Sequence, residues 1–422
     1  MHDTKSKWFL PFAMFCVAAF FYLYEFLLRV VPSVMRPELS SAFDIGAHEY
    51  GILAAIYFAS YAPLQLPVGG WIDRYGPRRL LTFAVVLCAL STVLSAYTTD
   101  YYIALLARFL IGAGSAFGFI SCMKVVAIWF QPQWFPVFAG ATLAIGASGA
   151  AASAPISYAL NVIDWRTLLI ILGLIGLGIG LLCWLIIRDE NPHNKEALHP
   201  DNQADNFWTC LATVVKQPQS WLVGIYAFLT TAPTDALGGA WGVAFLTDAH
   251  GLDKDQASIA QAMTFVGMAV GSPLLGWIAK RFNNRKKPMM VSALVATLAL
   301  TALIYAPMMT FQLASLLFFM FGAFGTYVLA FVVIRYIIEV RYVATAVGFV
   351  NMISMIGSMS LTYIIGCILD AVRSGAVDAE GMPVYLWSDY KVGLVLLPIF
   401  YAVASLVVVP LIHDKSEGSM DV

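Results

Sequence analysis

The sequence GGWIDRYGPRRL, running from Gly69 to Leu80, is a short polar interruption between two long apolar stretches. A connection of so few residues must turn sharply, and a glycine such as Gly76 adopts turn conformations without steric cost. Charged residues of both signs flank that glycine: Asp73, Arg74, Arg78 and Arg79. Such a cluster can latch two helices together, and its basic residues are typical of a cytoplasmic loop.

The composition of the chain excludes a soluble globular protein. Of 422 residues, 60% are hydrophobic and only 12% are charged, against about 25% charged in an ordinary globular domain. The net charge of −1 leaves no excess of lysine and arginine for phosphates, so we expect no nucleic-acid partner. The expected partners are the lipid bilayer and small solutes. The six cysteines have no CxxC spacing, and we expect neither disulfides nor a metal site.

Twelve segments are long and apolar enough to cross a bilayer. A hydrocarbon core about 30 Å thick needs about 20 apolar residues in a helix, because only a helix satisfies its own backbone there. The predicted spans are residues 8–35, 49–71, 80–97, 101–124, 135–160, 165–187, 221–246, 256–279, 288–305, 311–337, 343–369 and 392–412. The predicted fold class is therefore an all-α membrane protein with 12 transmembrane helices.

A polar stretch divides the predicted helices into two sets of six. Residues 188–219 are rich in Pro, Asn, Asp and Glu, which is typical of a solvated linker. We therefore predict one six-helix bundle at 1–187, a cytoplasmic linker at 188–219 and a second bundle at 220–422. Most of the 24 lysines and arginines then lie on one side of the membrane, which predicts an inner-membrane protein with both termini in the cytoplasm.

The two halves share a short internal repeat at the end of their second predicted helix. The pattern Pro-x-x-Gly-Trp-Ile begins at Pro67 and again at Pro273. Repeated bundles of membrane helices are typical of secondary transporters, in which two similar bundles enclose a site near the bilayer midplane and rock around it. The repeat therefore favours a transporter that works by alternating access.

The loop from Gly69 to Leu80 also resembles the signature loop of the major facilitator superfamily. The matching residues are Gly70, Asp73, Arg74, Gly76, Arg78 and Arg79. The resemblance implies two pseudo-symmetric six-helix bundles, and a gate role in which the acid and the arginines hold the inner side closed in the outward-open state. In the second half Ala279 replaces the acid, so we expect a weaker latch there.

Two further stretches bear on this resemblance. The sequence RFLIGAGSA, from Arg108 to Ala116, is similar to the family's second motif, an intramembrane arginine followed by glycines that allow close helix packing. The fifth predicted helix carries Pro155 without the paired glycines of the family's antiporter motif. That departure favours uptake over drug efflux.

The first predicted helix resembles that of the superfamily's anion and cation symporters. Arg29, Ser33 and Pro37 fit the symporter spacing, although Leu28 stands where those proteins carry an acid and Glu25 lies one turn earlier. The resemblance implies a substrate that bears a carboxylate. The chain is also similar in general to proteobacterial importers of amino acids.

Four charged residues lie inside predicted spans and away from the span ends, where each costs about 2.5 to 3.5 kcal/mol on insertion scales. They are Glu25, Arg29, Arg108 and Asp235. Glu25 and Arg29 are one helical turn apart, so they can pair with each other or with a ligand. By the internal repeat, Asp235 stands where Arg29 stands in the first half, and the two can face each other across a cavity. A salt bridge there would close the outer path until a proton or a zwitterionic solute takes one partner.

These charges are the candidates for proton coupling. A carboxylate in a partly dry cavity can load a proton on one side of the membrane and lose it on the other. We therefore assign proton coupling to Glu25 and Asp235, together with Arg108. The alternative is that Glu25 pairs with Arg29 or Arg108 only to lower the cost of burial. The expected energy source is the proton gradient, with no cofactor.

Aromatic and polar side chains could complete a binding site around Arg29. Most aromatic residues of such helices only pack or face lipid. The candidates for substrate binding are Tyr22, Tyr24, Tyr57, Tyr61, Trp241, Tyr327 and Asn351.

Other function classes have less support. An enzyme would need a nucleophile with a base or metal ligands, an ATP-driven pump would need GxxxxGK[ST], and a channel would present a filter loop or a ring of like charge. A receptor on the same fold stays open. We therefore expect a monomeric, non-enzymatic secondary transporter that carries an amino acid or small organic acid by proton symport. The alternatives are proton-coupled export of drugs or metabolites, and facilitated diffusion.

Overall fold

The structure, a computed structural model, describes residues 3–130, 135–189, 207–281, 285–325, 327–339, 342–373 and 385–413. All regular structure in these ranges is helical, as the composition predicts. The first half of the chain forms α1 (Asp3–Val34), α2 (Arg36–Phe43), α3 (Ala47–Leu64), α4 (Pro67–Tyr75), α5 (Pro77–Tyr97), α6 (Tyr101–Ser115), α7 (Gly118–Trp129), α8 (Phe135–Ala151), α9 (Ser153–Leu160) and α10 (Trp165–Ile186).

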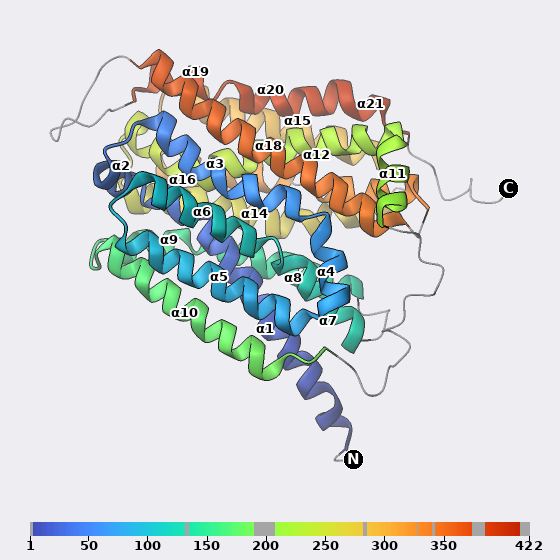
Figure 1. Cartoon of the computed structure of the whole chain (residues 1–422). Helices are drawn as coiled ribbons and strands as arrows, with labels where there is room; N and C mark the ends of the chain where they lie inside the picture. Colours follow the sequence, from blue (N-terminus) through green and yellow to red (C-terminus); the bar gives the residue numbers. More distant parts are fainter. Residues whose placement is uncertain are drawn as a thin grey trace.

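The second half repeats this arrangement of long antiparallel helices (Figure 1). It forms α11 (Phe207–Lys216), α12 (Pro218–Ala236), η3 (Leu237–Trp241), α13 (Gly242–Ala244), η4 (Phe245–Ala249), α14 (Lys254–Arg281), α15 (Lys286–Tyr305), α16 (Phe311–Phe324), α17 (Val328–Ile337), α18 (Val343–Val372), α19 (Trp387–Gly393), α20 (Leu396–Val403), η6 (Ala404–Val408) and α21 (Val409–Leu411). The η segments are wider, π-type turns within otherwise α-helical rods.

Ten helical segments in the described part of the chain are long and apolar enough to cross a membrane. They correspond to ten of the predicted spans. The other two predicted spans, 49–71 and 221–246, are also helical but interrupted. In the first of these, Pro63 and Pro67 each remove a backbone N–H, and α3 gives way to α4 between them. In the second, Pro233 precedes the change from α12 to η3.

Two helices lie where the sequence predicts loops. The amphipathic α2 follows α1 directly, and Leu39 is its buried residue. The helix α11 falls inside the stretch 188–219 that we predict as a linker; its Val214 is fully buried, whereas Trp208 is 69% exposed. Part of that predicted linker therefore packs on the second half. The rest of it, residues 190–206, lies outside the described residues.

Glycines in α6 bring the helices of the first half close together. A Cβ at Gly112 would lie 2.0 Å from the carbonyl oxygen of Tyr57, and one at Gly114 would lie 2.6 Å from that of Ala84. Only glycine permits such a contact between helix backbones. The expected close packing after Arg108 is thus present, and it sets α6 against α3 beside Tyr57.

The two halves meet along α3 and α18, and along α14 with α8 and α9. We call the end of the bundle that carries α2 and α19 the α2 end, and the opposite end, with α4 and α11, the α4 end (Figure 1). At the α2 end, Arg36 Nη1 lies 2.9 Å from Asp248 Oδ2, and the backbone N–H of His48 donates to Asp370 Oδ2 over 2.6 Å. Both contacts join one half to the other, so the halves are held together at the α2 end.

Candidate functional site

A buried charged group lies between the two halves, and Arg29 is its centre. One turn earlier on α1, Glu25 places Oε2 at 3.4 Å from Arg29 Nη2. The exposed fraction is 6% for the arginine side chain and 0% for the glutamate. A buried charge is stable only when it is paired and hydrogen-bonded. The spacing of four residues therefore produces the pair that the sequence predicts.

The second half supplies the other acid. Oδ1 of Asp235, in α12, lies 4.0 Å from Arg29 Nη1. The hydroxyl of Ser358, in α18, donates to Oδ2 of Asp235 over 2.7 Å. The cation and the anion that the internal repeat relates do face each other across the interface between the halves. At 4.0 Å this is the longer and looser of the two pairs that Arg29 makes.

Aromatic rings surround the guanidinium of Arg29. Its Cζ lies 4.2 Å from the ring centre of Phe26, 5.2 Å from that of Tyr61 and 5.5 Å from that of Tyr57. The Tyr57 hydroxyl also donates to Glu25 Oε2 over 2.8 Å. Ring faces carry partial negative charge, so they stabilise a desolvated cation without neutralising it. The rings thus lower the cost of burying the charge of Arg29.

One oxygen of Glu25 and one nitrogen of Arg29 remain without a partner. Among the side chains that the structure describes, Glu25 Oε1 and Arg29 Nε are buried and accept or donate no hydrogen bond. The Tyr57 and Arg29 contacts of Glu25 both use Oε2. Oε1 can therefore take up a proton while those contacts persist.

The fourth intramembrane charge, Arg108, binds backbone. Its Nη1 donates to the carbonyl of Leu28 and its Nη2 to that of Arg29, each over 2.6 Å. Its Cζ lies 4.8 Å from the ring centre of Tyr57. The structure therefore brings Arg108 beside the charged group but directs its end nitrogens to α1. Its proton-coupling role stays a prediction.

Two amides join the halves on the α4 side of this group. Nδ2 of Asn351, in α18, donates to Oε1 of Gln65 over 2.9 Å. Gln65 also donates to the carbonyl of Ala116 over 3.4 Å. Asn351 is one of the predicted site residues and Gln65 is not. An amide pair offers both donors and acceptors to a polar solute.

The other predicted aromatic residues occupy different surroundings. Tyr22 packs its ring edge-on against Phe26 at 4.9 Å and is buried. The Tyr24 hydroxyl donates to the carbonyl of Leu172 in α10 over 3.0 Å, which directs it into the first half and away from Arg29.

Two further candidates lie in the second half. Trp241 is fully buried and donates to the carbonyl of Thr362 over 3.2 Å. Tyr327 is half-buried and its ring lies 5.3 Å from that of Phe331. The Trp241 ring also packs edge-on against that of Tyr50 at 5.2 Å, so it lies at the interface between the halves.

The charged loop turns as expected. Gly76 has φ +82°, and a Cβ there would lie 2.5 Å from Asp189. The backbone N–H of Arg78 donates to Asp189 Oδ1 over 2.8 Å, and its Nε donates to the carbonyl of Trp184. The loop is thereby fastened to the end of α10. Arg79 is exposed, and Gly70 has open space around it.

The predicted latch itself is only partly visible. Asp73 and Arg74 belong to α4. Their side chains, on which the predicted latch depends, are outside what the structure describes.

Two polar site residues that sequence reasoning missed, Gln65 and Ser358, lie at helical spacings from residues that it predicted. Gln65, the residue that caps α3, follows Tyr61 by four residues and Tyr57 by eight, and Ser358 follows Asn351 by seven on α18. Residues at these spacings share one helix face. A polar stripe on an otherwise apolar helix is a signal that could have identified Gln65 and Ser358.

This arrangement has a clear relation to known proteins. The sequence profile of the Major Facilitator Superfamily matches residues 12–359 and 223–419. The chain belongs to this superfamily. Its all-α membrane fold and signature loop agree with the family, as expected from the resemblance.

Several relatives within the Major Facilitator Superfamily are similar in sequence. The uncharacterized transporter YybO of Bacillus subtilis is 26% identical over 62% of this chain and 63% of its own length. The probable sulfoacetate transporter SauU of Cupriavidus necator is 23% identical over 64% and 65%. The chain thus spans a little under two thirds of these two relatives. The membrane sensor protein UhpC of Salmonella typhimurium is 20% identical over 90% of this chain and 86% of its own.

Solved structures of two other transporters share the fold. A bacterial homolog to the human lysosomal transporter Spinster, in an inward-facing and unoccupied conformation, has a TM-score of 0.72 at 18% identity, covering 94% of this chain and 97% of that one. The nucleoside transporter NupG (D323A mutant) has a TM-score of 0.75 at 13% identity, covering 95% and 99%.

Proposed function

We propose that this superfamily member is a secondary active transporter that imports a small organic anion together with protons. The observation that carries the proposal is the buried Arg29, held between Glu25 of its own helix and Asp235 of the other half. A single cation between two acids from different halves can exchange partners when the halves move. An external carboxylate or sulfonate is the natural competitor for the guanidinium.

The charges of the group explain why protons would accompany the anion. With both acids ionised, Glu25 and Asp235 balance the charges of Arg29 and of Arg108 beside it, so the group has no net positive charge to attract an anion into a desolvated site. Each proton taken up by an acid removes one negative charge and frees Arg29 for the substrate. The open Oε1 of Glu25 supports that acid as the first to load.

The relatives support the anionic substrate class. SauU is named as a probable sulfoacetate transporter, and sulfoacetate carries two acidic groups. An amino acid stays within the proposal, because Asp235 could accept an ammonium group while Arg29 binds the carboxylate. Export and facilitated diffusion remain alternatives that the same experiment tests.

Alternating access is the proposed transport cycle, in a monomer of the inner membrane with both termini in the cytoplasm. The contacts between Arg36 and Asp248, and between His48 and Asp370, support a state that is closed at the α2 end. By the predicted topology this is the outer end. Opening it requires that these contacts break while the α4 end closes.

A sensor that binds the anion without carrying it is the second candidate. The relative UhpC, which is named a membrane sensor protein, matches 90% of this chain. Such a protein would keep the Arg29 group and bind the same anions. It would not move them through the membrane.

The test is uptake into proteoliposomes of labelled sulfonates, organic acids and amino acids under an acid-outside gradient. Glu25→Gln and Asp235→Asn are compared with the native protein, and Asp44→Asn, an acid-to-amide change at an exposed position, is the matched control. We expect gradient-driven uptake that either site variant abolishes and the control retains. Uptake unaffected by the gradient and by both variants would overturn proton symport, and binding without uptake would favour the sensor.

A further inference from the structure

The helix α1 lacks one backbone hydrogen bond where it carries the charged group. Pro32 lies inside α1, and a proline has no N–H to donate to the carbonyl four residues earlier. The carbonyl so released is that of Leu28, next to Arg29. An unpaired buried carbonyl is costly, so another donor must serve it.

Arg108 is that donor. Its two end nitrogens hold the carbonyls of Leu28 and Arg29, each over 2.6 Å. The side chain comes from α6 and is 7% exposed. Its guanidinium also lies against the ring of Tyr57, which donates to Glu25. One side chain therefore touches the backbone that carries Arg29 and the tyrosine that holds Glu25.

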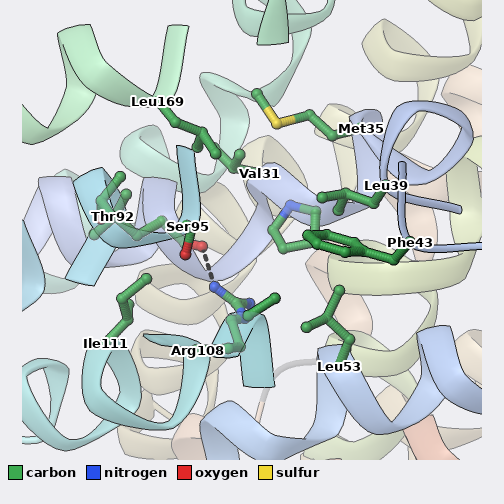
Figure 2. Close-up of a pocket in the computed structure, with 13 residues that line it drawn as sticks. Val31, Met35, Leu39, Phe43, Leu53, Thr92, Ser95, Arg108, Ile111 and Leu169 are labelled. Atoms are coloured by element: carbon green, nitrogen blue, oxygen red, sulfur yellow. Dashed lines mark hydrogen bonds between the residues drawn. The ribbon is translucent and has the colours of Figure 1, made fainter. Parts of the chain in front are cut away.

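A small cavity lies beside Leu28 and Pro32. It is partly open, has a volume of about 50 Å³ and is lined by 13 residues. Figure 2 shows Arg108 at its edge, with Thr92 and Ser95 of α5 on one side and Leu39 and Phe43 of α2 on the other. Pro32 and Leu28 line it as well. The space beside Leu28 and Pro32 lacks the van der Waals contacts that a filled core would supply to this turn of α1.

We propose that Arg108 is a positioning residue that fixes Glu25 and Arg29 by binding the carbonyls of Leu28 and Arg29, where Pro32 leaves α1 without a backbone hydrogen bond. In this role it carries no proton and binds no substrate. The assignment concerns the geometry of α1, and only its transport readout rests on the proposed function. The positive charge of Arg108 then serves to bind backbone, and proton uptake is left to Glu25 and Asp235.

A double-mutant cycle between Arg108→Gln and Pro32→Ala tests this role. Alanine at 32 restores the N–H for the Leu28 carbonyl, so it should make Arg108 dispensable. We expect Arg108→Gln alone to lower proteoliposome uptake about tenfold or more, as for a lost charged hydrogen bond, and to shift its pH profile. In the Pro32→Ala background the loss should be under about threefold and the pH profile native. Equal losses in both backgrounds would overturn the proposal.

Thermal unfolding of the detergent-purified variants gives a second readout that does not need transport. The drop in midpoint caused by Arg108→Gln should shrink in the Pro32→Ala background, even if Pro32→Ala itself impairs uptake. Arg166→Gln is the matched control, because Arg166 also serves two carbonyls, those of Ala96 and Thr98, at 2.6 and 2.7 Å. Its effect should be the same in both backgrounds. An additive Arg108 effect would refute the positioning role, whatever the fate of the transport proposal.

Discussion

The helices that carry the charges of the two halves, α1 and α12, both contain a proline near the charged group, but different side chains bind the backbone there. At Pro32 in α1, a buried arginine from α6 serves the freed backbone. Beside Pro233 in α12, the hydroxyl of Tyr401 donates over 2.6 Å to the carbonyl of Thr230, the residue after Leu229 whose carbonyl the proline frees, and the helix then widens into η3. The first half thus uses a cation where the second uses a neutral hydroxyl.

This difference extends to the charges of the site. α1 carries both Glu25 and Arg29, whereas α12 contributes only Asp235. The pseudo-symmetric halves are therefore alike in backbone but unlike in electrostatics. We infer that the first half holds the cation in place and the second supplies a counter-ion that can leave it.

The largest effect should come from removing the shared cation. Arg29→Gln leaves two buried carboxylates without their partner, at about 3–5 kcal/mol, and we expect uptake to fall more than about 100-fold. Adding Asp235→Asn should restore much of the thermal stability but none of the uptake. Proteoliposome uptake and thermal unfolding measure the two effects. Uptake within tenfold of native would contradict the inference that the first half holds an essential cation.

Removing the neutral hydroxyl that binds the backbone of the second half should have a smaller effect. Tyr401→Phe removes the hydroxyl that reaches the carbonyls of Thr230 and Gly325, which should cost about 1–2 kcal/mol of stability. We expect a lower unfolding midpoint but uptake within about threefold of native, because no charge is lost. A loss of uptake as large as that of Arg108→Gln would mean that the Tyr401 and Arg108 contacts with backbone are equally important.

The next smaller effect should come from the turn of the charged loop at Gly76. Gly76→Ala places a Cβ at φ +82° and ψ 151° and against Asp189, a conformation that is essentially glycine-only and costs about 1–3 kcal/mol. We expect a lower unfolding midpoint by thermal scan, part of which Asp189→Ala restores.

Gly251→Ala is the control for this change. Gly251 has φ +65° and open space around it, so it reports conformational strain without a clash. If Asp189→Ala restores nothing in the Gly76→Ala protein, the contact with α10 is irrelevant to the loop.

The smallest effect should come from the α2 end. Arg36 and Asp248 are 11% and 23% exposed, and partly hydrated pairs contribute about 0.2–1 kcal/mol. The double-mutant cycle of Arg36→Gln and Asp248→Asn should give a coupling energy of that size in thermal unfolding, decreasing with salt. A coupling above about 2 kcal/mol would make this pair as important as the Arg29 group.

Much of the fold could be predicted from sequence because each rule involved is local. Hydropathy located the helices, and the loop after Gly69 indicated the family. The helices α2 and α11 were missed because they are short and amphipathic, so they have no long apolar run. The pairing of Arg29 with Asp235 was predictable only through the internal repeat. Gln65 and Ser358 were missed because they are uncharged residues whose importance depends on the helix that faces them.

The sequence by itself determined the all-α membrane fold and the identity of the four intramembrane charges, because the cost of burying polar groups in a bilayer acts residue by residue. Only the tertiary structure decided which partner each charge has. Arg108 could pair with a carboxylate or with backbone, and the choice depends on α6 approaching α1 where Pro32 frees a carbonyl. That approach depends on the glycine contact between α6 and α3, which joins residues far apart in the chain.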